Sequence, residues 1–71
     1  MKYKALFKRR DGNVVVIKVC DNREDAINAC LDYNDNYCLD SRQERYESLK
    51  IRDFYVCGCG PDELSIEEVV E

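Results

Sequence analysis

The chain has 71 residues, of which 45% are hydrophobic and 37% are charged, and it carries a net charge of −4. This length holds one hydrophobic core, so we expect a single domain over residues 1–71, and the low glycine and proline content argues against disorder. The absence of histidine excludes Ser–His and Cys–His nucleophile pairs within one chain, and no apolar run is long enough to span a membrane.

Two runs of strand-forming residues, 2–9 and 13–20, flank the turn around Gly12 and predict a β-hairpin. Two registers compete. A two-residue turn opposes Phe7 to Val16, whereas a three-residue loop with Gly12 in the left-handed region pairs residue 9 with residue 13. We predict the three-residue loop, because it collects the apolar residues on one face. Its cost is a like-charge pair between Lys4 and Lys18.

The next segment predicts an amphipathic helix. Asp21 or Asn22 is a suitable N-cap, and acidic residues follow in the first turn. An apolar stripe at helical spacing comprises Ala26, Ile27, Cys30 and Leu31. The run 34–36 is a poor helix former and should end the element.

The second half of the chain is harder to interpret. Residues 41–44 match a capping box and predict a turn of helix. Residues 49–56 predict a third strand, with a bulge at Arg52-Asp53. Residues 61–63 suit the first turn of a short acidic C-terminal helix.

The expected fold class is therefore α+β, a small ββαβ(α) domain. It has a three-stranded, mainly antiparallel sheet with the third strand beside the first. One main helix covers the face that carries Tyr3, Phe7, Val15 and Ile17, and the acidic C-terminal helix either packs on the other face or joins a second copy.

Five cysteines could be read as a disulfide scaffold, but their number is odd and no secretory signal precedes them. We expect a cytoplasmic protein with free thiols and no cofactor. As an alternative, a small zinc- or thiol-binding domain would use Cys57 and Cys59 together with Cys20, at one end of the sheet, and Cys30 or Cys38 as a further ligand. We expect Cys30 to be buried in the helix stripe instead.

Charge divides the chain unevenly. The first twenty residues hold six basic side chains and one acid, and the rest is strongly acidic. As a second alternative, nucleic acid would bind a lysine face of the sheet formed by Lys2, Lys4, Lys8, Lys18, Lys50 and Arg52. The sequence pI of about 4.8 opposes this alternative.

The missing catalytic side chains favour a protein that is not an enzyme and acts by protein–protein binding, as an inhibitor or adaptor. In size and charge the chain resembles phage-encoded inhibitors of host nucleic-acid enzymes, including anti-CRISPR proteins, and this resemblance implies a partner with a basic groove. We expect a monomer or homodimer without membrane contact. The candidate contact residues are acidic, tyrosine and arginine side chains: Asp25, Asp32, Asp35, Tyr37, Arg42, Arg45 and Tyr46.

Overall fold

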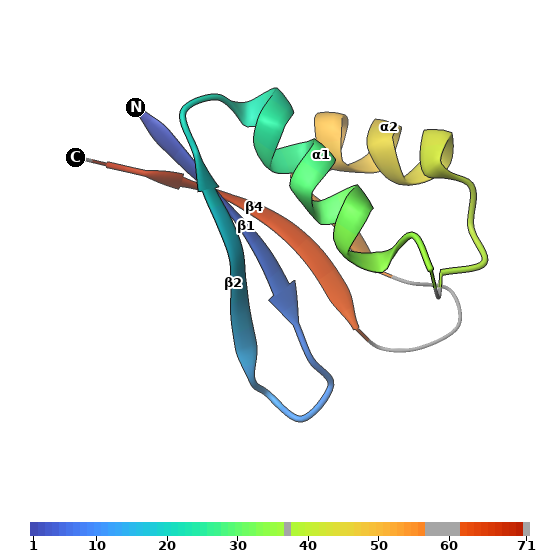
Figure 1. The fold of residues 1–71 in the computed structure, drawn as a ribbon. Helices are drawn as coiled ribbons and strands as arrows, with labels where there is room; N and C mark the ends of the chain where they lie inside the picture. Colours follow the sequence, from blue (N-terminus) through green and yellow to red (C-terminus); the bar gives the residue numbers. More distant parts are fainter. Residues whose placement is uncertain (37, 57–61, 71) are drawn as a thin grey trace.

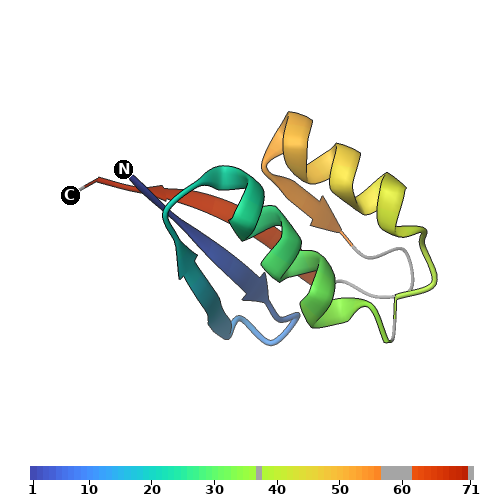
Figure 2. The ribbon, with the colours of Figure 1, turned by 45° about the horizontal axis from the view of Figure 1, so that its top comes forward.

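The computed structural model describes residues 1–36, 38–56 and 62–70. In chain order these form β1 (Lys2–Lys8), β2 (Val14–Cys20), α1 (Arg23–Asn34), α2 (Arg42–Arg52), β3 (Phe54–Val56) and β4 (Glu63–Val69). The four strands make one antiparallel sheet in the order β2-β1-β4-β3. Both helices lie side by side on the same face of this sheet (Figures 1 and 2). The α+β class and the antiparallel sheet are confirmed, but the prediction of three strands is wrong.

The fourth strand forms where a C-terminal helix was expected. Leu64 and Ile66 are buried in the core, whereas Glu67 is exposed. Residues two apart lie on one face of a strand but far apart around a helix, so only the strand buries both apolar side chains. Seven residues of this strand pair with β1, and this pairing supplies hydrogen-bond partners for the backbone N–H and C=O groups on the second edge of β1. This strand, and not the third, is the neighbour of the first.

Residues 42–52 form a helix, which corrects the prediction of a strand from residue 49. The Ser41 hydroxyl accepts a hydrogen bond from the Glu44 N–H at 3.2 Å, as the capping box predicts. Arg45 and Leu49, four residues apart, both turn into the protein. Asp53 has a φ of 64° and donates its N–H to the Leu49 carbonyl, which ends the helix. Only residues 54–56 remain for the strand.

The three-residue loop of the hairpin is confirmed. Gly12 has a φ of 94°, and the Arg9 N–H donates to the Asn13 carbonyl at 2.8 Å. The expected register holds from Lys8 to Leu6, and beyond it a bulge shifts the pairing by one residue. Lys4 therefore opposes Val19, and the expected like-charge pair with residue 18 does not form.

The first helix follows the sequence prediction closely. Asn22 is its N-cap, with the side chain accepting from the Asp25 N–H at 2.9 Å, and the helix ends at Asn34. The predicted apolar stripe is buried in full against the sheet. Phe7, Ala5, Leu64 and Ile66 supply the sheet side of this core, with Leu49 from α2. The core thus lies between the helices and one face of the sheet, and no helix of the described residues covers the other face.

Candidate functional site

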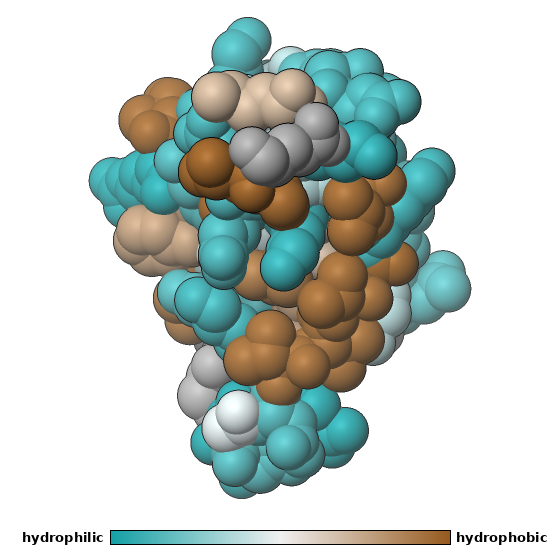
Figure 3. All heavy atoms as spheres, turned by 90° about the vertical axis from the view of Figure 1, so that its left-hand side faces the viewer, coloured by the Kyte–Doolittle hydropathy of each residue, from teal (hydrophilic) through white to brown (hydrophobic). Residues whose placement is uncertain are grey.

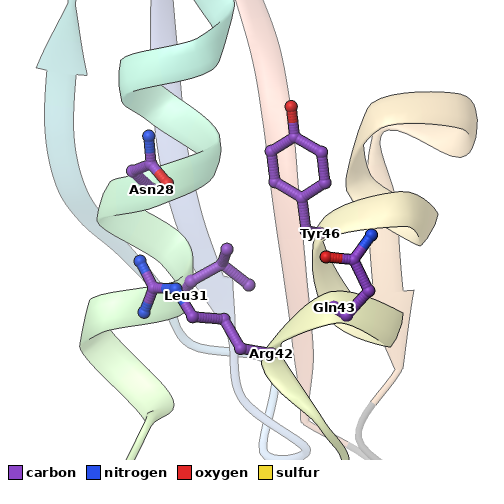
Figure 4. Close-up of a pocket in the computed structure, with 5 residues that line it drawn as sticks. All are labelled: Asn28, Leu31, Arg42, Gln43 and Tyr46. Atoms are coloured by element: carbon purple, nitrogen blue, oxygen red, sulfur yellow. The ribbon is translucent and has the colours of Figure 1, made fainter.

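A hollow of about 400 Å³ opens to solvent between the two helices. Asn28 and Leu31 line it from α1, and Arg42, Gln43 and Tyr46 line it from α2 (Figure 4). Leu31 is almost fully buried and reaches toward α2, so it forms an apolar floor beneath polar walls. We call this hollow and its five residues the helix groove. Amide, phenol and guanidinium groups around an apolar floor are suited to holding a peptide side chain.

Tyr46 is fixed at one end of the helix groove. Its hydroxyl donates to the Glu24 carboxylate, at 2.8 and 3.0 Å from the two oxygens. This hydrogen bond to a carboxylate raises the pKa of the Tyr46 hydroxyl. The Lys50 ammonium lies 5.7 Å from the centre of the Tyr46 ring. The orientation of the Tyr46 ring is therefore fixed before a partner binds.

Arg42 closes the opposite end. Its guanidinium pairs with Asp35 at 2.5 Å and with Asp32 at 3.0 Å, so it bridges from α2 to the end of α1. The arginine side chain remains 45% exposed. Because the Asp35 carboxylate receives hydrogen bonds from Arg45 and lies beside Arg42, the pKa of Asp35 is lowered from its ordinary value of 3.8.

Arg45 is buried beneath this end of the helix groove. It donates to the Leu31 carbonyl at 3.2 Å, to the Asn34 side-chain oxygen at 2.5 Å and to Asp35 at 2.7 Å. Its Nε atom has no hydrogen-bond partner among the described residues. A side chain with 3% exposure cannot reach a binding partner, so its role is to join the helices.

A second arginine joins the helices at their other end. Arg23, in the first turn of α1, donates to the carbonyls of Leu49 and Lys50 at the end of α2, at 2.8 and 2.5 Å. It also pairs with Asp53 at 2.5 Å. The last carbonyls of a helix have no intrahelical partner, so this guanidinium caps α2 from outside. Arg45 and Arg23 thus hold the two helices together at opposite ends, and we call them the arginine clasps. Together they fix the spacing of the helices.

The structure brings together part of the predicted contact set. Arg42 and Tyr46 line the helix groove, and Asp32 and Asp35 lie at the Arg42 end of it. Asp25 is exposed but is engaged with the N-cap, where Asn22 donates to its carboxylate at 3.0 Å. Tyr37 lies outside the described residues.

Sequence reasoning missed the other three groove residues, Asn28, Leu31 and Gln43, as contacts. Placing Gln43 opposite Asn28 requires a continuous second helix, and the sequence pattern predicted only one turn there. The i, i+4 spacing of Arg45 and Leu49 was the available signal.

The predicted lysine face is smaller than expected. Lys50 and Arg52 lie on α2 and not in a sheet strand. On the uncovered face of the sheet, Lys4 opposes Glu67, and Lys8 opposes Glu63 with 3.8 Å between the charged atoms. These carboxylates partly neutralise the basic strand, which weakens the case for phosphate binding.

Three of the five cysteines lie among the residues that the structure describes. Cys20 and Cys30 are buried thiols, as predicted for Cys30, and Cys38 is half-buried. Burial raises the pKa of Cys30 to about 11, so this thiol stays protonated at neutral pH. The described residues contain no cluster of three or more metal-ligating side chains. Cys57 and Cys59 lie outside them, so the zinc alternative stays a prediction.

None of the helices in the described part of the chain is long and apolar enough to cross a membrane. Comparison with models of known protein families, with curated proteins and with solved structures finds no match to this chain.

Proposed function

We propose that this chain is a non-enzymatic protein-binding domain, an inhibitor or adaptor, and that its helix groove holds a side chain or short loop of the partner. The observation that carries this proposal is the groove itself, in which Tyr46 and Arg42 flank an apolar floor. Tyrosine and arginine are the residues that most often dominate the binding energy of interfaces. The two arginine clasps hold the groove open before binding, which reduces the ordering cost of association.

The charge around the groove indicates the kind of partner. Glu24, Asp25, Asp32, Glu44 and Glu47 are exposed on the two helices. A partner with a basic surface would be attracted and oriented by these carboxylates. A nucleic-acid enzyme with a basic substrate channel has this property, so it is the partner class that we propose, in the manner of a phage-encoded inhibitor.

The test is capture of the partner from an extract of the native host, with and without nuclease, followed by titration of the purified partner. Asn28→Ala and Gln43→Ala shorten groove walls without touching the core, and together they should weaken binding at least about tenfold, the effect of losing about 1.4 kcal/mol. Lys18→Ser, on the sheet, is the control and should bind like the parent. Unchanged affinity in the groove variant, or capture of nuclease-sensitive nucleic acid alone, would refute the proposal.

A further inference from the structure

The face of the sheet opposite the helices carries large apolar side chains in the open. Val14, Val16, Phe54 and Val56 are 55%, 52%, 41% and 51% exposed. Seen from that side, hydrophobic side chains gather in a band above the tip of the hairpin (Figure 3). These side chains lie on the two outer strands of the sheet, and so much exposed apolar surface on one face of a small protein marks a candidate interaction site. We call this surface the open face.

The strand registers arrange the open face in rows across the sheet, two of which reach all four strands. In one row Val14 opposes Lys8, Lys8 opposes Glu63, and Glu63 opposes Val56. The next row reads Val16, Leu6, Ser65 and Phe54, and the row after it reads Val19, Lys4 and Glu67. Apolar residues therefore occupy both outer strands. The β1 column has Lys4 and Lys8 on either side of the buried Leu6, and the β4 column has Glu67 and Glu63 on either side of the buried Ser65.

The open face of one copy is complementary in charge to the open face of a second copy in which the strand order is reversed. A two-fold axis parallel to the strands, placed between β1 and β4, lays the strand order β2-β1-β4-β3 over β3-β4-β1-β2 of a second copy. Lys4 then faces Glu67 of the second copy, Lys8 faces its Glu63, and Val16 faces its Phe54. Lys4 and Lys8 thus each meet an opposite charge, and Val14 and Val16 meet the apolar residues of β3, whereas Lys2 meets Val69 and Leu6 meets Ser65.

We propose that two copies of this chain associate through their open faces, as a two-fold symmetric sandwich with the sheets about 10 Å apart. The favoured occupant is a second copy because it supplies this charge pattern in the required order. Pairing along the free edge of β2 is less favoured, since that edge carries Lys18 and the bulge, two features that oppose edge-to-edge association.

The size of the open face determines how tightly we expect two copies to associate. Three seven-residue strands, each about 23 Å long, and the three-residue β3, about 10 Å long, lie about 4.8 Å apart and give a flat area of roughly 400 Å² per copy. This area lies at the low end for specific complexes, so we expect a dissociation constant on the order of micromolar. In such a dimer the two helix grooves face outward on opposite sides, so the dimer would present two binding sites. The dimer itself does not depend on the proposed groove function.

Analytical ultracentrifugation from about 1 to about 500 µM tests the proposal, because this range brackets a micromolar dissociation constant. The parent should change from monomer to dimer. Lys4→Glu places two glutamates in apposition, and Glu67→Lys places two lysines, so each variant alone should weaken dimerisation at least about tenfold. Lys50→Glu, the same charge change on α2, is the matched control and should dimerise like the parent. Circular dichroism verifies that each variant is folded.

Mixing the Lys4→Glu and Glu67→Lys variants gives the decisive measurement. At one of the two symmetric contacts, the carboxylate introduced by the first variant faces the ammonium introduced by the second. At the other contact, the native Glu67 of the first variant faces the native Lys4 of the second. Opposite charges therefore meet at both contacts, and a heterodimer should form at concentrations at which each variant alone is mostly monomeric.

Two results would overturn the proposal. One is a parent that stays monomeric at all concentrations. The other is a dimer that tolerates both charge reversals, because such a dimer uses another surface, such as the β2 edge. Asn28→Ala with Gln43→Ala should leave dimerisation unchanged, which separates this result from the groove function.

Discussion

At the scale of single residues, Arg45 has the most demanding environment in the described part of the chain. Its charge is buried, and the protein compensates with the Leu31 carbonyl, the Asn34 side chain and the Asp35 carboxylate. Removal of one partner from a buried polar network leaves the others unsatisfied. The stability of the helix pair should therefore depend on this side chain far more than on the exposed Arg42 nearby.

We expect Arg45→Met to lower the free energy of unfolding by about 2–3 kcal/mol, because Asn34 loses its partner while the methionine keeps most of the packed volume. Arg42→Ala is the control and should cost less than about 1 kcal/mol, since its ion pairs are exposed to solvent. Urea denaturation followed by circular dichroism measures both. Equal losses in the two variants would contradict this assignment.

The Asp35 carboxylate should make stability depend on pH. Its pKa is lower in the folded protein than in the unfolded chain, because hydrogen bonds from Arg45 and the charge of Arg42 favour the ionised form. Its contribution is therefore complete above the ordinary carboxyl pKa and is lost as the pH falls through the lowered value. Asp35→Asn should destabilise the protein at pH 7, and the difference from the parent should shrink as the solution is acidified. A difference that stays constant with pH would show that Asp35 is not the titrating group.

At the scale of elements, the sequence predicted those whose signals are local. The hairpin loop follows from Gly12, and α1 follows from the Asn22 cap and the apolar stripe. The second helix was hidden because Leu49, Ile51, Phe54 and Val56 resemble a strand, although Ile51 is 78% exposed in the fold. The last strand was hidden because glutamates and a proline suggested a helix start. Pairing with β1, across more than fifty residues of chain, decides its conformation.

The hairpin loop allows a clean test of backbone conformation. Apart from Gly12 and its two chain neighbours, no atom of the described residues lies within 4 Å of the place that a Cβ at Gly12 would occupy, so a substitution there meets no steric obstacle among them. Gly12→Ala should still cost about 1–2 kcal/mol, because its φ of 94° is unfavourable for residues with a Cβ. Gly12→Asn should cost less, since asparagine tolerates left-handed conformations better. Thermal unfolding of the three proteins checks this order, and an alanine variant as stable as the parent would contradict it.

At the scale of the whole molecule, the two proposed binding surfaces lie on different sides, one on the helices and one on the sheet. Both helices lie on one side of the sheet (Figure 1), so the groove between them and the open face are on opposite sides of the molecule. The sequence predicted this separation in outline, because strand alternation and the helix stripe indicate which side each residue faces. It could not predict the groove, which needs two helices in contact, nor the charge columns, which need β4 beside β1.

Association through the open face should also appear in thermal stability. Because a dimer stabilises only folded chains, the melting temperature of the parent should rise by a few degrees from about 2 to about 200 µM. The Lys4→Glu variant should show a smaller rise over the same range, because its dimer is weaker. Differential scanning calorimetry measures both melting temperatures, and a variant whose melting temperature rises as much as that of the parent would assign the effect to a different contact.

The central position of β4 has a consequence for the order of folding. The hairpin and α1 are complete by Asn34, but β1 keeps an unpaired edge until residues 63–69 arrive between it and β3. A nascent chain that ends before Glu63 therefore holds a two-stranded ribbon, which is marginally stable in water. Closing the long intervening segment should limit the folding rate. During synthesis, the exposed edge of β1 is thus a place where a chaperone, or another nascent chain, would bind first.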